Sequence, residues 1–234
     1  MHQAYHKWYS PSLSMEMQML VFGERGLPII LFPTSMGKHN ENRDFKLIDS
    51  VAWFVENGFV KIYCPDGIDE LSWYNTAIHP ATRAYNHNCY DRFLHEELVP
   101  QMKRDTGFDR IGVAGCSFGG YHAANYAFKH PENVSNLMTM GAAFDIRRRV
   151  EGYYDDNVYF NNPVDYLQGA EEPALWNMKI VLGTTEDDFC KPSNLDLSRI
   201  LAHKGIDHWL DIRPYGAHDW PIWREMFPHY LSLR

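Results

Sequence analysis

A serine flanked by glycines is the residue of this 234-residue chain best suited to nucleophilic chemistry. Ser117 stands in the pattern Gly115-x-Ser117-x-Gly119, within the stretch GCSFGGY. A serine hydroxyl attacks a carbonyl carbon when a neighbouring base takes its proton, and the two glycines permit the sharp turn that exposes it. A glycine-rich turn without any chemistry has the same letters, so the flanking elements decide between the two interpretations.

Those flanking elements favour the nucleophile. Residues 110–115, RIGVAG, are an apolar run that predicts a buried strand, and residues 118–129 predict a helix rich in small residues. A strand, a serine and a helix in that order form the turn called a nucleophile elbow, and N–H groups at the start of the helix face a developing oxyanion. Cys116 does not fit the same role, because Ala114 stands where the pattern needs glycine.

A base and an acid should follow such a serine in the order acid, then histidine. Only His218, of twelve histidines, stands in a loop after a predicted strand and in that order, so we predict that it is the base. Three carboxylates follow the preceding predicted strand: Glu186, Asp187 and Asp188. They cannot all be buried beside one imidazole as charged groups, so one should face the histidine and the others the solvent.

The elements that must hold these residues alternate along the chain. Apolar periodicity predicts strands at 14–23, 28–33, 60–66, 110–115, 136–144, 178–184 and 208–214, and helices at 44–57, 81–103, 118–129, 193–205 and 223–231. This alternation predicts a single α/β domain over residues 1–234, with a mostly parallel sheet and helices on both faces. Residues 147–172 lack periodicity, and we expect an insertion or small cap there.

Composition limits the partners and the compartment. The hydrophobic fraction of 45% is that of a globular protein, and a formal charge of −8 argues against a nucleic acid partner. The arginines at 147–149 are interpreted as a solvated turn. The sequence shows neither a signal peptide nor a membrane-spanning run, and its four cysteines lack CxxC spacing, which predicts unpaired thiols and a cytoplasmic protein.

No metal or cofactor is predicted. Four candidate ligands are spaced too irregularly for a structural zinc site: His79, His87, Cys89 and His95. Aromatic residues near the expected site are candidates for substrate contact, namely Trp73, Tyr121 and Trp220. For each of them, packing in the core is as good an interpretation.

Several stretches of the sequence together resemble a known group of proteins. The run HEELVPQMKRDTGFDRIGVAGCSFGGYHAANYAFKHPENVSNLMTMG and the terminal GAHDWPIWREMFPHYL are similar to the esterase D and feruloyl esterase group of α/β-hydrolases. FPTSMG, SWYN and YFNNPVDYL bring it nearest to a branch of intracellular bacterial esterases. The resemblance implies the α/β-hydrolase fold and Asp188 as the acid. Thr185 replaces a glycine of the relatives, so Asp187 stays the alternative.

The predicted activity is hydrolysis of a small-molecule carboxylic ester by a serine esterase. The oxyanion hole should combine the N–H of Phe118 with a donor from the loop at 33–37, where Thr34 and Ser35 are the two candidates. An acyltransferase using the same acyl-enzyme is the alternative, and a non-catalytic binding protein is the third hypothesis. The sequence leaves the substrate and the oligomeric state open, a homo-oligomer included.

Overall fold

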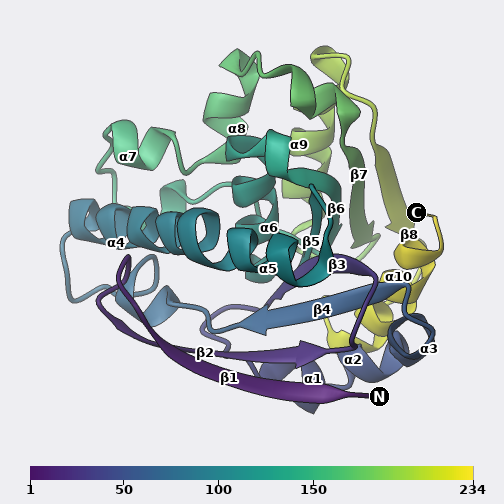
Figure 1. The fold of residues 1–234 in the computed structure, drawn as a ribbon. Helices are drawn as coiled ribbons and strands as arrows, with labels where there is room; N and C mark the ends of the chain where they lie inside the picture. The colour runs from purple at the N-terminus through teal and green to yellow at the C-terminus, as the bar shows by residue number, and fades with distance from the viewer. Residues whose placement is uncertain (234) are drawn as a thin grey trace.

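The strands of the computed structural model, which describes residues 1–233, form one twisted sheet (Figure 1). Over these residues the sheet has eight strands in the order β1-β2-β4-β3-β5-β6-β7-β8. Their bounds are β1 Gln3–Ser10, β2 Met15–Phe22, β3 Leu27–Phe32, β4 Val60–Pro65, β5 Ile111–Cys116, β6 Val134–Met140, β7 Lys179–Thr185 and β8 Trp209–Arg213. β2 pairs antiparallel with β1 and β4, and the pairs from β4 to β8 are parallel. The predicted mostly parallel sheet is confirmed.

Helices cover both faces of the sheet, as predicted. One face carries α1 Glu41–Asp44, α2 Leu47–Ser50, α3 Ala52–Glu56 and α10 Trp220–Ser232, and the other carries α4 Pro80–Arg92, α5 Val99–Thr106, α6 Phe118–Lys129 and α9 Lys191–His203 (Figure 1). Both faces of the central strands are therefore buried, and every residue of β5 is buried. This explains the continuous apolar runs by which these strands were recognised.

The prediction of one continuous helix at 44–57 is wrong, because the chain forms three short helices there, α1, α2 and α3. Lys46 has φ +62°, a left-handed conformation that a continuous helix cannot contain. Of the apolar residues whose spacing predicts the helix, Ile48, Val51 and Val55 face the core, whereas Phe45 is 48% exposed. The helical spacing therefore marks the buried side of this segment, but it does not reveal that the segment is divided into three short helices.

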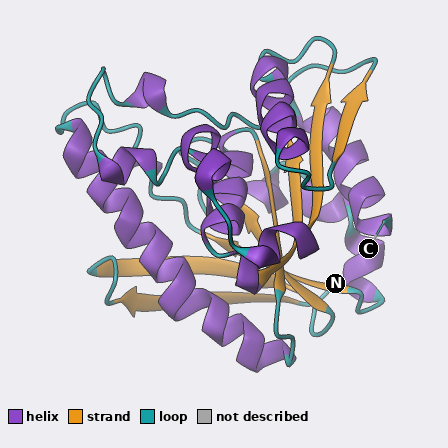
Figure 2. Cartoon of the chain, turned by 90° about the horizontal axis from the view of Figure 1, so that it is seen from above, coloured by secondary structure: helices purple, strands orange, loops and turns teal. Residues whose placement is uncertain are grey.

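A long helical run crosses the antiparallel part of the sheet (Figure 2). It joins α4 and α5 through a π-helical segment, η2 Phe93–Leu98, and ends at Gly107, whose φ is +74°. Phe93 stacks on Trp8 of β1 with ring centroids 5.8 Å apart. The helix predicted at 81–103 is thus present and slightly longer, and it covers the strand that the sequence did not predict.

Short helices occupy the aperiodic segment at 147–172 and the residues that follow it. They are η4 Arg147–Arg149, α7 Asp156–Tyr159, α8 Pro163–Tyr166, η5 Leu167–Gly169 and η6 Pro173–Asn177. The buried Arg83 of α4 fixes the start of the segment, donating to the Arg149 carbonyl at 2.7 Å and to Glu151 at 3.0 Å. The segment is therefore ordered by the fold around it, although its own sequence lacks a repeat.

Candidate active site

The carboxyl ends of the parallel strands meet at one edge of the sheet, and Ser117 stands there between β5 and α6. Its backbone has φ +53° and ψ −123°, a region that non-glycine residues avoid. A Cβ on Gly115 would lie 2.3 Å from Gly119, and one on Gly119 would lie 2.4 Å from the Pro33 carbonyl oxygen. The sharp turn therefore needs glycine at both positions, which is the mechanical reason for the sequence pattern.

His218 lies in the loop between β8 and α10 and reaches Ser117. Its Nε2 is 2.8 Å from Ser117 Oγ, so the hydroxyl donates to the imidazole when the ring proton is on Nδ1. Two aromatic rings hold the imidazole: Trp223 meets it edge-on at 5.0 Å, and Phe189 lies 4.1 Å away. Phe189 is 75% exposed, so one side of the base is covered by a side chain that solvent reaches.

Asp188 is the carboxylate that meets His218. The imidazole Nδ1 donates to Asp188 Oδ1 at 2.9 Å, and the Cys190 N–H donates to the same oxygen at 2.7 Å. Asp188 is only 4% exposed, whereas Glu186 and Asp187 are exposed and Glu186 pairs with Lys191. The run of three acids thus separates as electrostatics requires, with one buried carboxylate against the imidazole and two in water.

The loop after β3 has one backbone donor left for an oxyanion. The Thr34 N–H donates to Glu41 at 2.6 Å, the Met36 N–H to Asp69 at 2.9 Å, and the Gly37 N–H to the Thr34 carbonyl at 3.0 Å. Within the described residues the Ser35 N–H has no such acceptor, and Ser35 lines the cavity beside Ser117. Of the two candidates, Ser35 is the one whose donor stays available.

Two acids without any marking pattern in the sequence brace this loop: the half-buried Glu41 and the buried Asp69. Glu41 accepts from both the N–H and the hydroxyl of Thr34. Asp69 joins the loop to α6, because it accepts from the Met36 N–H and bonds His122 at 2.9 Å. His122 and Asp69 are 3% and 1% exposed, so the pair is buried in the core. No sequence spacing marks these contacts, since each crosses between distant segments.

The thiols near the site are poor nucleophiles. Burial raises the pKa of Cys116 well above its ordinary value, and Cys116 is fully buried. Burial, and then the charge of Asp188, raise the pKa of Cys190 to about 12. Both remain thiols at neutral pH, and a thiol is far less nucleophilic than a thiolate. All four cysteines are unpaired, as predicted.

A cavity of about 1050 Å³ opens at Ser117, which is large enough for a ligand of drug-like size. Its lining includes Ser35, Tyr74, Ser117, Phe118 and Phe189, residues of α9, and residues of the segment at 147–172. Trp73 and Tyr121 are fully buried and do not line it, so the expectation that they contact substrate is corrected to core packing. Trp220 does not line it either, and stacks on Phe45 instead.

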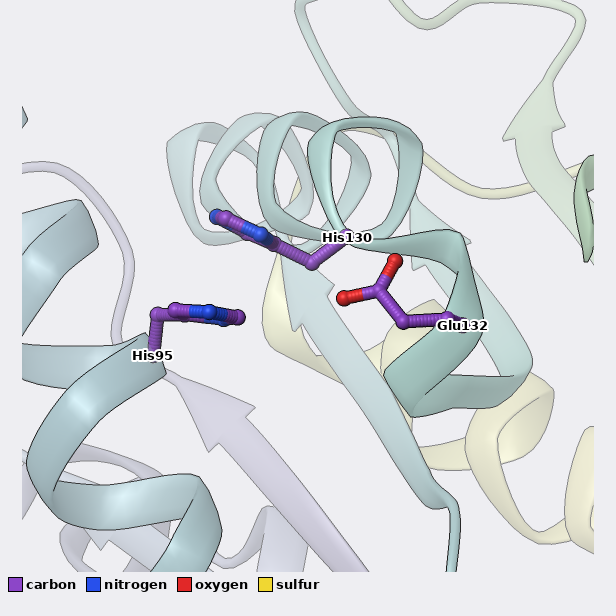
Figure 3. Close-up of side chains that lie close together, drawn as sticks. All are labelled: His95, His130 and Glu132. Atoms are coloured by element: carbon purple, nitrogen blue, oxygen red, sulfur yellow. The ribbon is translucent and has the colours of Figure 1, made fainter. Parts of the chain in front are cut away.

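Among residues 1–233, two groups of side chains lie close enough together to share a metal ion. One is Asp188, Cys190 and His218, whose thiol would have to lose a strongly held proton first. The other is formed by His95 in η2, His130 directly after α6 and Glu132 in η3 Pro131–Asn133 (Figure 3). The two imidazole rings there stack 4.1 Å apart and 19° from parallel. Ligand lone pairs lie in the ring plane, so these parallel rings cannot both point at one ion without turning.

The chain is similar to known hydrolases in both sequence and fold. The family described as the alpha/beta hydrolase fold matches residues 74–193. A ferulic acid esterase structure superposes with a TM-score of 0.80 at 19% identity, covering 99% of this chain and 97% of that one. An S-formylglutathione hydrolase from Staphylococcus aureus gives 0.75 at 18% identity, covering 99% and 96%. These likenesses establish the fold.

A curated protein matches over a shorter stretch. Over 76 residues the chain is 32% identical to a 1-acylglycerol-3-phosphate O-acyltransferase of Arabidopsis thaliana. That match covers 32% of this chain and 18% of the plant protein, so most of the plant protein lies outside the matched stretch. Within residues 1–233, none of the helices combines the length and the hydropathy that crossing a bilayer requires.

Proposed function

The chain belongs to the α/β-hydrolase fold family, and from this premise we propose that it is a serine hydrolase of carboxylic esters. Ser117 is the nucleophile, His218 the general base and acid, and Asp188 the group that orients the imidazole. The observation that carries the proposal is a continuous chain of hydrogen bonds. It runs from Ser117 Oγ to His218 Nε2 at 2.8 Å and from His218 Nδ1 to Asp188 at 2.9 Å. Ser117 lines a cavity, so a substrate can reach its hydroxyl.

The reaction proceeds in two halves. Ser117 Oγ attacks the ester carbonyl while His218 takes its proton, and the collapse of the tetrahedral intermediate returns that proton to the leaving alcohol. Water then attacks the acyl-enzyme, with His218 again as base, and releases the acid. Asp188 keeps the Nδ1 proton in place and stabilises the imidazolium that forms in each half.

The developing oxyanion accepts hydrogen bonds from the N–H groups of Phe118 and Ser35. Both belong to rigid backbone: Phe118 begins α6, and the loop of Ser35 is fixed by Glu41 and Asp69. Donors that are already oriented stabilise charge without reorganising, and each such donor contributes about 10²- to 10³-fold to kcat. The hydrolases whose fold this chain shares include one named for ferulic acid and one for S-formylglutathione, which supports an ester or thioester as the substrate.

Covalent labelling tests the nucleophile. A fluorophosphonate probe should modify the wild-type protein at Ser117 and leave the Ser117→Ala variant unlabelled. 4-Nitrophenyl esters of increasing acyl length should be hydrolysed, with a loss on the order of 10⁶-fold in Ser117→Ala. Label on Cys116, or turnover that survives in Ser117→Ala, would contradict the proposal. An unreactive wild-type protein that still binds the esters would favour the non-catalytic binding protein.

An acyltransferase is the second candidate, and the 76-residue likeness to an O-acyltransferase is the observation in its favour. The acyl-enzyme would be the same, with an alcohol replacing water in the second half. Adding primary alcohols to the assay distinguishes the two. A transferase would form the new ester faster than free acid at millimolar alcohol, whereas a hydrolase would release acid throughout.

We further propose a cytoplasmic enzyme built from a single domain. Four unpaired cysteines, three of them buried, suit a reducing compartment. Fractionation of the native host cells, with the protein detected by antibody, tests the location. Limited proteolysis that leaves one resistant fragment of nearly full length would support the single domain.

A further inference from the structure

The cavity at Ser117 carries a concentration of cationic side chains in a chain whose net charge is −8. Five lysine and arginine residues line it: Arg147, Arg148, Arg149, Arg199 and Lys204. Three carboxylates line it as well: Asp145, Asp165 and Asp196. An excess of positive charge inside a concave site raises the local concentration of anions.

Several of these cations already have partners. Arg147 donates hydrogen bonds to both oxygens of Asp145, and Arg199 pairs with Asp196 at 2.7 Å. Lys204 donates to the Gln168 carbonyl at 3.0 Å. Arg149 has no carboxylate within 4 Å in the described part of the chain, although it is only half-exposed.

Arg149 is nevertheless held in a defined position beside the reacting groups. Its guanidinium carbon lies 3.7 Å above the Tyr74 ring and 5.8 Å from the centre of the Phe118 ring. Phe118 directly follows the nucleophile, and the Tyr74 hydroxyl lies 2.6 Å from the hydroxyl of Ser35. The backbone of Arg149 is fixed from behind by the buried Arg83. Stacking on an aromatic face leaves the edge of the guanidinium, where its N–H donors point, free to meet a ligand.

We propose that the substrate is an ester with an anionic oxygen group, a carboxylate or a phosphate, and that Arg149 binds this group. The inference rests on the proposed function and names its substrate class. A guanidinium suits both anions, because its fork of N–H donors matches two of their oxygens at once.

Matched ester pairs test the preference. For the acyl side, the mono-4-nitrophenyl ester of pimelic acid is compared with its terminal carboxamide. For the alcohol side, 4-carboxyphenyl hexanoate is compared with 4-carbamoylphenyl hexanoate. Within each pair the size and shape stay nearly the same while the charge changes, and comparing each variant with wild type cancels the intrinsic difference in reactivity between the two esters. Wild type should favour the anionic member of at least one pair, mainly through KM, and the pair that responds shows which side carries the anion.

The Arg149→Met variant keeps an unbranched stem over the Tyr74 ring and removes the charge. We expect it to lower the anionic-to-neutral ratio of kcat/KM by about 10- to 100-fold, while its activity on the neutral esters stays within a few-fold of wild type. Arg149→Lys should lie between the two, because it restores charge without the fork. The control is Arg147→Met, from the same helical turn and cavity, which removes the same unit of charge from a guanidinium that Asp145 already occupies. It should lower the ratio by at most a few-fold, because only the general field of the cavity changes.

Competition separates the two anions. Adipate and phenyl phosphate are tested as inhibitors of neutral-ester turnover, and the one with the lower inhibition constant identifies the group. An unchanged ratio in Arg149→Met, or an equal fall in Arg147→Met, would overturn the assignment. If wild type hydrolyses no ester, the proposed function fails, and calorimetric binding of adipate and phenyl phosphate to Ser117→Ala, with and without Arg149→Met, still decides whether the anion site exists.

Discussion

Gly141 lies directly against the carboxylate of Asp188. A Cβ at position 141 would stand 2.6 Å from Asp188 Oδ2 and 3.1 Å from His218 Nδ1, and the residue has φ +60°. Gly141 follows β6, so the strand between the nucleophile and the acid ends in a residue that has to be small. A side chain at this position would collide with both members of the His218–Asp188 pair, whereas glycine leaves them room.

Gly141→Ala should therefore damage activity more than stability. The methyl group would push the acid or the imidazole aside, and displacements of about 1 Å in a catalytic group cost on the order of 10²-fold in rate. The left-handed backbone adds about 1–2 kcal/mol of destabilisation. Gly205→Ala is the matched control, since Gly205 has φ +66° and open space around its Cβ position. Equal kcat/KM losses in the two variants would contradict a role for Gly141 in positioning.

A substitution at Ser35 tests whether its backbone N–H is a donor of the proposed oxyanion hole. Thr34 to Gly37 form a turn closed by the Gly37 N–H to Thr34 carbonyl bond, with Met36 at φ +62°. A positive φ at the third position is typical of a type II turn, which accepts proline at its second position, here Ser35. Ser35→Pro should thus keep the turn and delete the N–H, lowering kcat by about 10²- to 10³-fold.

Ser35→Ala is the control for the same site, because it keeps the N–H and removes the hydroxyl that bonds Tyr74. We expect kcat for this variant to stay within about tenfold of wild type on neutral esters. Circular dichroism and urea denaturation establish that both variants fold. If Ser35→Pro folds and retains full kcat, the second donor lies elsewhere.

The order of elements was readable from the sequence because the central strands are buried on both faces and so leave unbroken apolar runs. β1 was not predicted, because it lies at the sheet edge and most of its residues are exposed. The exposed His6 interrupts its alternation between Ala4 and Trp8. An edge strand needs only one apolar face, which eight residues signal weakly.

The residues that we propose as the triad stand in local sequence patterns, whereas the residues that hold them in place do not. A glycine on either side of Ser117 and the order of acid and histidine are features of the chain itself. The choice between Thr34 and Ser35 depends on Glu41, which engages the Thr34 N–H only in the folded protein. The arginines at 147–149, interpreted as a solvated turn, line the cavity, because α9 faces them across it.

The free energy of unfolding should fall as the pH drops, because the buried His87 resists protonation in the folded protein. Burial lowers the pKa of His87 well below its ordinary value, and the charges of His122 and Lys129 act in the same direction. Asp91 opposes them. Below about pH 6.5 the unfolded chain binds a proton that the folded His87 does not, so the free energy of unfolding falls by up to about 1.4 kcal/mol per pH unit.

Urea denaturation at pH 7.5 and pH 5.5 measures this dependence. His87→Gln keeps an acceptor for the Asn125 amide, which lies 3.2 Å from His87 Nε2, and removes the titration. We expect the variant to lose less stability than wild type between the two pH values. Parallel declines would mean that other groups cause the acid sensitivity.

The three consecutive carboxylates give the last prediction. Asp188 is buried and accepts from His218 Nδ1, whereas Asp187 and Glu186 are exposed. Asp188→Asn keeps the shape but replaces the anion, so the imidazole loses the group that fixes its tautomer. Its kcat/KM should fall roughly 10⁴-fold. Asp187→Asn and Glu186→Gln should each stay within about tenfold of wild type, since an exposed charge contributes little.

One chromogenic ester and three single variants, each checked for folding by circular dichroism, measure the difference. A crippled Asp187→Asn beside an active Asp188→Asn would mean that the working acid is one residue earlier, and that the buried contact between Asp188 and His218 is not the one used in catalysis. Full activity in all three would reduce the triad to a dyad of Ser117 and His218. A loss confined to Asp188→Asn would show that burial, rather than mere proximity in the sequence, selects the acid from its neighbours.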